Sequence, residues 1–260
     1  MRKKGFYKLV EIMAKLRSKN GCPWDRVQTH RTLLPYLLEE AYEVLDAIEA
    51  KDDLKLKEEL GDLLLQIVFH SKIAKEKKRF DIEEVIENLI CKLKVRHPHV
   101  FKKKRKLTPK EVVDNWEHIK KVTKNQMVLS GIPDKLPALL KAYRVQEKVS
   151  RFGFDWQKTD DIFEKIKEEI CEFEKAYKKK RKKTSEEELG DIFFSLVNLS
   201  RHLKINPEFV LRKTVKKFVK RFNYIEKELS KKGKDLKKTS LAEMDKLWEE
   251  AKKIQRIHRS

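Results

Sequence analysis

Apolar side chains recur along most of the chain at spacings of three and four residues, which is the period of an amphipathic helix. The first such segment, residues 4–19, places five of them on one face: Phe6, Leu9, Val10, Met13 and Leu16. The same period predicts further helices over 33–50, 54–77, 82–96, 108–122, 136–151, 161–177, 185–203, 207–229 and 241–254. We find no convincing strand pattern of alternating Val, Ile and Thr, so the sequence predicts an all-α fold.

Turn-forming and basic residues separate these helices. We expect residues 22–25, Cys-Pro-Trp-Asp, to form a compact loop, and Thr32 to cap the next helix. The run Lys-Lys-Lys-Arg-Lys-Lys at 178–183 predicts a basic loop, and residues 102–106 predict another. In the helix over 54–77 the pattern predicts one buried row: Leu56, Leu60, Leu63, Ile67 and Ala74.

A single break divides the predicted helices into two halves. Residues 130–133 read Ser-Gly-Ile-Pro, a composition typical of a linker. We therefore expect two helical domains, one over residues 1–128 and one over residues 129–260, and 260 residues are enough for two such cores.

Acidic residues concentrate on two neighbouring predicted helices of the first half. Glu39, Glu40 and Glu43 share one helix face, and Glu59 and Asp62 share a face of the next helix. If the two helices fold back antiparallel, both sets face one gap. Carboxylates held that close repel one another, and a cation between them relieves the repulsion. Oxygen ligands without nearby Cys or His favour Mg²⁺ first and Mn²⁺ second, although such acids are also typical of a solvated helix face.

The second half repeats this acid pattern in register. Each of its members lies 129 residues after a counterpart in the first half: Glu168, Glu169, Glu172, Glu188 and Asp191. Solvated surface charge has no reason to keep such a register. Gly61 and Gly190 repeat as well, each within a helix, where glycine costs about 1 kcal/mol relative to alanine. The repetition indicates two copies of one site, with a close approach of backbone, helix or ligand at each glycine.

Basic and aromatic residues repeat after each acid pattern. Lys92 and Arg96 share a helix face in the first half, as do Lys217 and Arg221 in the second. A Trp-x-x-x-Lys pattern follows in each half: Trp116 with Lys120, and Trp248 with Lys252. Lysine and arginine bind phosphoryl oxygens, and a tryptophan offers a flat face to a nucleobase.

The net charge and the cysteines indicate which binding partners and which cell compartment suit the sequence. The net charge is +21, from 63 Lys and Arg against 42 Asp and Glu, which attracts polyanions or reflects a lysine-rich composition of the source. Three cysteines without a C-x-x-C pair fit a reduced, cytoplasmic protein. The longest apolar stretch, residues 63–69, is too short for a bilayer, so we expect no membrane association.

These parts together describe a nucleoside triphosphate site. Divalent cations held by carboxylates neutralise and orient a polyphosphate and activate water. The chain has no G-x-x-x-x-G-K-[ST] loop and no evident covalent nucleophile, which leaves attack of water on a phosphorus atom.

The doubled E-E-x-x-E and E-L-G-D motifs resemble the MazG family of nucleoside triphosphate pyrophosphohydrolases in its two-copy form. C-P-W-D at 22–25, R-H-P-H-V-F at 96–101, G-F-D-W at 153–156 and the final L-W-E-E-A-K extend the resemblance over nearly the whole chain. The resemblance implies paired helical bundles, a homodimer, and Mg²⁺-dependent hydrolysis of NTP to NMP and diphosphate.

The resemblance also implies roles for individual residues. The implied metal ligands are Glu169, Glu172, Glu188 and Asp191 in the second copy and Glu40, Glu43, Glu59 and Asp62 in the first. The implied nucleotide contacts or supporting residues of the second copy are Lys165, Glu168, Lys217, Arg221, Trp248 and Lys252. We expect the second copy to be the main catalytic site, because its basic helix and tryptophan match the family pattern more fully.

Three hypotheses remain open. The first is a housekeeping NTP pyrophosphohydrolase of broad base specificity. The second is a relative with one narrow substrate, such as dUTP, phosphoribosyl-ATP or an alarmone. The third, which we do not favour, is a basic nucleic-acid-binding scaffold without catalysis, which would show a steep salt dependence of binding.

Overall fold

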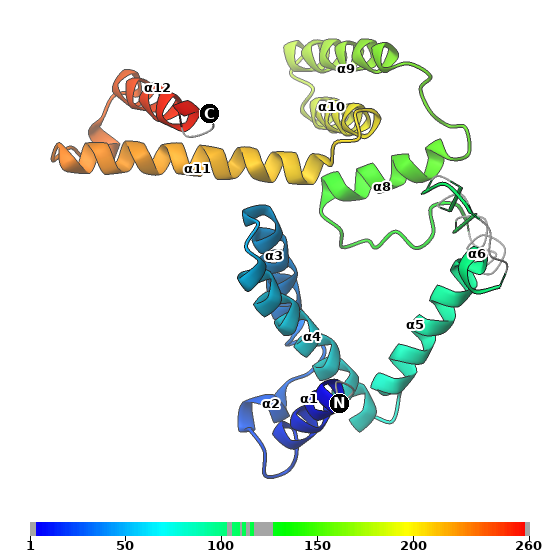
Figure 1. Cartoon of the computed structure of the whole chain (residues 1–260). Coiled ribbons are helices and arrows are strands. Elements are labelled where there is room, and N and C mark those ends of the chain that lie inside the picture. Colours follow the sequence, from blue (N-terminus) through cyan, green and yellow to red (C-terminus); the bar gives the residue numbers. More distant parts are fainter. Residues whose placement is uncertain (1–3, 103–105, 110, 113–114, 117–126, 258–260) are drawn as a thin grey trace. The chain divides into compact units, whose positions relative to one another are not determined.

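The computed structural model describes residues 4–257, apart from residues 103–105, 110, 113–114 and 117–126 and the side chains of 256 and 257. The described residues form helices and no strand, which confirms the predicted all-α fold. The chain divides into two compact units, Met1–Ile119 and Lys120–Ser260 (Figure 1). The domain boundary at residues 128 and 129 stays a prediction. No described helix has the length and apolar character needed to cross a membrane.

The first unit is organised by a helical hairpin. Its described helices are α1 (Lys4–Leu16), α2 (Pro23–Val27), α3 (Leu34–Ala50), α4 (Asp53–Glu76), α5 (Ile82–Arg96) and α6 (Pro98–Phe101). Lys51 ends α3 in the left-handed conformation, and the Asp52 side chain caps α4 by accepting from the Lys55 amide. This short link turns α4 back along α3 (Figure 1). A core of Met13, Leu33, Val68, Phe69 and Ile73 joins α1 to α4.

The second unit repeats the hairpin and adds another. Its described helices are α8 (Ala138–Ser150), α9 (Thr159–Lys178), α10 (Lys182–His202), α11 (Pro207–Lys231), the 3₁₀ turn η1 (Leu236–Lys238) and α12 (Leu241–Ile257). Helices α9 and α10 pack along one another, and α8 packs against α10. Helix α11 folds back onto α12 around a core of Ile225, Leu229 and Leu247.

Three local predictions are wrong. Residues 23–25 of the expected loop 22–25 belong to helix α2 (Pro23–Val27), because Pro23 suits the first helical position. Thr32 does not cap α3: the N-cap is Leu33, and the Thr32 hydroxyl instead donates to Gln28 Oε1 at 2.8 Å. The basic loop shrinks to residues 179–181, because the lysines on either side extend α9 and α10.

The predicted buried row of α4 is also wrong in part. Leu60 is 50% exposed and Ile67 is 43% exposed. The face of α4 that turns toward α3 carries Glu59 and Gln66, both about 94% buried, rather than this apolar row. Ala74 of the predicted row is buried as expected, whereas the other apolar residues buried on α4 lie outside that row: Val68, Phe69 and Ile73.

Candidate metal and nucleotide site

Helices α3 and α4 bring three carboxylates together in the first unit. Glu40 and Glu43 on α3 and Glu59 on α4 each offer an oxygen within 4.8 Å of the others. We call these residues the N-terminal acid group. Around one octahedral Mg²⁺ ion, adjacent oxygens lie about 3.0 Å apart and opposite oxygens about 4.2 Å apart, so the three side chains must draw closer together to bind one ion. The donor set and its spacing therefore fit a hard divalent cation.

The electrostatics of this group favour a cation as well. Burial raises the pKa of the Glu40 carboxyl, and the charges of Asp62, Glu43 and Glu59 raise it further. Burial also raises the pKa of Glu59, with Glu43 as the next cause. Neighbouring carboxylates thus make Glu40 and Glu59 harder to ionise, and a bound cation would reverse that cost.

Helices α9 and α10 form the equivalent arrangement in the second unit. Glu169 and Glu172 on α9 and Glu188 on α10 offer oxygens within 4.8 Å of one another, and we call them the C-terminal acid group. Burial raises the pKa of Glu188, followed by the charges of Glu172, Glu169 and Asp191. Among the described residues, these two acid groups are the places where at least three potential metal ligands meet at this spacing.

The structure brings together three of the four predicted ligands in each copy. Asp62 and Asp191 lie outside the two groups, although their charges act on Glu40 and Glu188. Each aspartate is the last residue of an E-L-G-D motif and lies about one helical turn after the glutamate that begins it. Their predicted role as ligands stays a prediction.

A lysine accompanies the C-terminal acid group. Lys165 Nζ lies 2.9 Å from Glu169 Oε1 and 3.1 Å from Glu168 Oε1. The hydrogen bonds to Glu169 and then Glu168 raise the pKa of Lys165 well above its ordinary value. In the first copy the position of Lys165 is taken by Tyr36, and Lys55 Nζ lies 3.7 Å from Glu59 Oε1.

The predicted basic and aromatic residues of the second copy meet on α11 and α12. The Arg221 guanidinium lies over the Trp248 ring, 5.2 Å from its centroid, and Arg221 Nε donates to Gln255 Oε1 at 2.9 Å. Lys217 is on α11, one turn before Arg221, and Lys252 on α12 forms a 2.7 Å ion pair with Glu249. The four predicted contacts therefore belong to one hairpin, separate in sequence from the acid helices.

The equivalent residues of the first copy are described only in part. Lys92 and Arg96 lie on α5, and the Trp116 ring meets His97 edge to face at 5.1 Å. The Trp116 indole nitrogen is buried and has no hydrogen-bond partner among the residues that the structure describes. Lys120 lies outside the described residues.

The two repeated glycines do not mark a close approach within the chain. A Cβ atom added at Gly61 or at Gly190 would meet no atom within 4 Å beyond its own helix. The sequence suggested three causes for these glycines, namely a close approach of backbone, helix or ligand, and among the described residues neither of the first two is present, which leaves a ligand.

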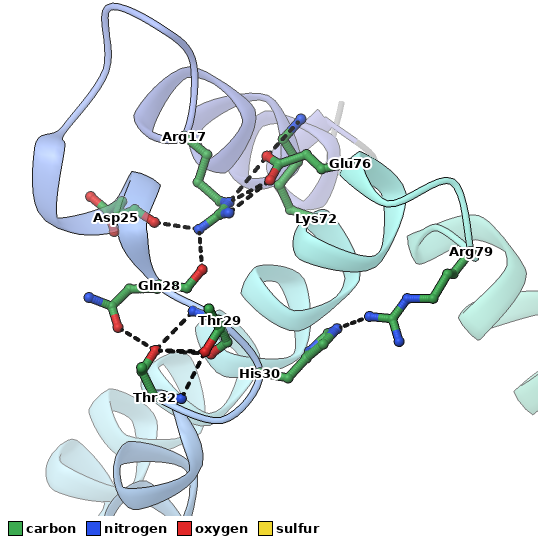
Figure 2. Close-up of polar contacts among 9 residues, drawn as sticks. All are labelled: Arg17, Asp25, Gln28, Thr29, His30, Thr32, Lys72, Glu76 and Arg79. Atoms are coloured by element: carbon green, nitrogen blue, oxygen red, sulfur yellow. Dashed lines mark hydrogen bonds and ion pairs between the residues drawn. The ribbon is translucent and has the colours of Figure 1, made fainter.

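Sequence reasoning missed a polar network that fastens residues 17–32 onto α4 (Figure 2). Arg17, whose side chain is 5% exposed, donates to Glu76 from Nη2 at 2.8 Å and from Nε at 3.1 Å. It also donates to the carbonyl oxygens of Asp25 and Gln28. Arg79 donates to His30, which in turn meets His70. Residues 159 and 199, at the positions equivalent to the two histidines, are Thr and Leu, so the repeat offered no signal.

Comparison with known proteins identifies the family of the chain. A family model described as the MazG nucleotide pyrophosphohydrolase domain matches residues 28–101 and again residues 157–225. Each match contains one acid group.

Relatives match nearly the whole chain. A Thermotoga maritima protein named nucleoside triphosphate pyrophosphohydrolase/pyrophosphatase MazG is 47% identical over 250 residues, covering 95% of both chains. An Escherichia coli K12 nucleoside triphosphate pyrophosphohydrolase is 40% identical over 253 residues, covering 95% of this chain and 96% of that protein. The crystal structure of a MazG-related protein from Thermotoga maritima aligns with 44% of this chain and 98% of its own at 31% identity, with a TM-score of 0.39. The chain belongs to the MazG family and contains two copies of its nucleotide pyrophosphohydrolase domain.

Proposed function

We propose that the chain is a Mg²⁺-dependent nucleoside triphosphate pyrophosphohydrolase of broad base specificity. Water attacks a phosphorus atom, the bond between the α- and β-phosphoryl groups breaks, and NMP and diphosphate leave. One observation carries the proposal: each MazG match holds three carboxylates, from two helices, at a spacing that suits a divalent cation. The names of the relatives, which specify nucleoside triphosphates without a base, support the reaction class.

The roles of the residues follow from their chemistry. Glu169, Glu172 and Glu188 would hold Mg²⁺, with Mn²⁺ as a substitute, and Asp191 would complete the set. The cation, when bound, supplies positive charge to the phosphoryl oxygens and acidity to water. Lys165 is close enough to the same group to donate to a phosphate, and Glu168 orients it at 3.1 Å.

We propose the C-terminal copy as the main catalytic site. Support comes from Lys165 beside its acid group and from the Lys217, Arg221, Trp248 and Lys252 set on α11 and α12. The first copy has Tyr36 in the place of Lys165. Separate hydrolysis assays of variants in each acid group would rank the two copies.

We also propose that the enzyme is a homodimer. Several large apolar side chains of α9, α10 and α11 are more than 40% exposed in the single chain: Phe163, Ile170, Leu189, Phe193, Phe194 and Phe218. Exposed apolar side chains mark an interface where they gather into one contiguous patch, and we propose that these do so between two copies of the chain. Light scattering should give twice the chain mass of 31.1 kDa. The three free cysteines support a reduced, cytoplasmic setting.

The test is an assay of products from a panel of NTPs and dNTPs with Mg²⁺. We expect NMP and diphosphate, rather than inorganic phosphate, from several bases. The double variant Glu43→Ala, Glu172→Ala should lose more than about 100-fold of the rate. Glu174→Ala is the matched control, because Glu174 is an exposed acid of α9 that pairs with Lys178 and lies outside the acid group. An unchanged rate in the double variant would refute the proposal, and turnover of a single nucleotide would favour a narrow-substrate enzyme.

A further inference from the structure

The two acid groups differ in the lysine side chain that lies beside them. In the C-terminal acid group the Lys165 ammonium is 2.9 Å from Glu169 and 3.1 Å from Glu168. The Glu169 side chain is 8% exposed, so this ion pair is largely shielded from water on the glutamate side. Such a charge-assisted hydrogen bond is among the stronger polar contacts in a protein.

The Lys165 contact competes with metal binding. An ammonium group bonded to a carboxylate oxygen carries positive charge close to the place where Glu169 would hold a divalent cation. Two like charges at that separation repel, and they repel more in a partly buried site than in bulk water. A metal that binds this oxygen without a nucleotide must therefore displace Lys165 from Glu169 and leave its ammonium without this partner.

A nucleotide removes that penalty. The lysine side chain is long, and its own carboxylate partners lie one turn further along α9, so the freed ammonium stays at the site. A triphosphate supplies new acceptor oxygens for it. The metal displaces Lys165 from Glu169, and the displaced ammonium then donates to a phosphate oxygen of the nucleotide. Metal binding and nucleotide binding therefore favour each other.

The N-terminal acid group does not have this arrangement. Tyr36 is one turn before Glu40, where the second copy has Lys165 before Glu169, and its ring packs against Trp24 at 5.8 Å. The lysine nearest to Glu59 in the first copy, Lys55, is 3.7 Å away, and its side chain is 47% exposed. A contact of that length and exposure competes weakly for the carboxylate.

We propose that Lys165 is a built-in counter-ion whose displacement couples metal binding to nucleotide binding in the C-terminal copy, whereas the N-terminal copy binds metal without that exchange. This inference rests on the proposed function, since it assigns a regulatory role to the same site. It predicts that the C-terminal acid group binds metal weakly until a nucleotide is present.

The experiment measures Mn²⁺ binding by electron paramagnetic resonance of the free ion, in full-length chain, with and without a non-hydrolysable α,β-methylene triphosphate. Glu43→Gln with Glu59→Gln silences the N-terminal acid group, so that the signal reports the C-terminal one. In that background Lys165→Gln should bind Mn²⁺ alone roughly tenfold more tightly, and the tightening caused by the nucleotide analogue should shrink by a similar factor. Circular dichroism of each variant checks that it is folded.

Lys167→Gln is the matched control. Lys167 lies on the same helix as Lys165, and its replacement by glutamine removes the same charge. Its side chain is 70% exposed, and its Nζ atom lies 2.8 Å from Glu164 Oε1. It should leave Mn²⁺ binding within about twofold of its background, because exposed charges are screened. Equal Mn²⁺ affinities in the Lys165→Gln and Lys167→Gln variants would overturn the inference. An undiminished effect of the nucleotide analogue in Lys165→Gln would overturn it too.

Failure of the inference and failure of the proposed function give different results. A wild-type chain that releases diphosphate while Lys165→Gln binds Mn²⁺ as the wild type does contradicts only the counter-ion role. A wild-type chain that binds Mn²⁺ but releases no diphosphate contradicts the proposed function. In the Glu43→Gln, Glu59→Gln background, Mn²⁺ binding that survives Glu172→Gln would show that the C-terminal acid group is not the metal site, which overturns both.

Discussion

Replacing His70 with asparagine should make the folding stability less dependent on pH below about pH 6.5. The His30 and His70 rings stack with their centroids 5.1 Å apart, and their Nδ1 atoms are 2.8 Å apart. An arginine can only donate, so Arg79 donates to His30 Nε2, and the His30 proton is on Nδ1. His30 then donates to His70 Nδ1, which makes both imidazoles neutral in the folded chain.

The pKa values act in the same direction. Burial lowers the pKa of both histidines, and for His30 the charges of His70, Arg79, Lys77 and Arg17 add to the effect. Unfolded histidines titrate near 6.5, so below that pH the unfolded chain binds more protons than the folded chain. The stabilisation is complete above pH 6.5 and is lost as the pH falls toward the folded pKa. One histidine contributes at most about 1.4 kcal/mol per pH unit, and two contribute at most about 2.7.

Urea unfolding of both chains at pH 7.5, 6.5 and 5.5 provides the assay. Asparagine keeps an acceptor near the position of His70 Nδ1 and cannot be protonated, so the variant should stay within about 1 kcal/mol of the wild type at pH 7.5. Below pH 6.5 the wild type should lose stability more steeply, by up to about 1.4 kcal/mol per pH unit. The acid groups, whose raised pKa values act in the opposite direction, are common to both chains and cancel in the difference. If the free energies of unfolding of the two chains changed with pH in parallel, the conclusion that both histidines are neutral in the folded chain would be refuted.

Three other measurements test the fold and the site. Arg17→Met should destabilise the chain by about 2–3 kcal/mol in urea unfolding, because it removes the Arg17 hydrogen bonds to Glu76 and to the carbonyl oxygens of Asp25 and Gln28. Burial alone would raise the pKa of Asp155, but hydrogen bonds from Arg201 and His202 outweigh it and lower that pKa. Asp155→Asn should therefore cost about 1–3 kcal/mol at pH 7, and the cost should disappear as the pH falls through the folded pKa, below about 3.8. Mg²⁺ at 100 times its dissociation constant should stabilise the wild type by about 2.7 kcal/mol per site in thermal unfolding, and chelation or substitution of both acid groups by glutamine should remove the effect.

Much of the fold could be predicted because local rules decide it. Helix α5 spans Ile82–Arg96 as predicted, since Asp81 accepts from the Glu83 and Glu84 amides and Pro98 prevents continuation. The acid groups were predictable for a similar reason: the helical period determines which residues share a face, and the 129-residue register identified the helices that carry them.

The rest depends on contacts that no local pattern contains. Leu60 and Ile67 fit a buried row, yet α4 has more than one apolar face, and only tertiary packing decides which face meets the core. The His30–His70 contact joins residues 40 positions apart and has no echo in the second half. Periodicity cannot predict a pair of that kind, and neither can composition.

The two copies also differ in which arm of the hairpin holds the buried carboxylate. It is Glu59 on α4 in the first copy and Glu169 on α9, the counterpart of α3, in the second. In both copies the buried acid has a lysine four residues before it on the same helix, Lys55 or Lys165. A buried carboxylate without a cation is costly, and in each copy a lysine lies beside the acid that is buried. The lysines occupy non-equivalent positions, and only Lys165 is near enough to compete fully with a metal. The repeat has therefore kept the carboxylates in register while their counter-charges diverged, and a difference in metal binding between the copies follows from that divergence.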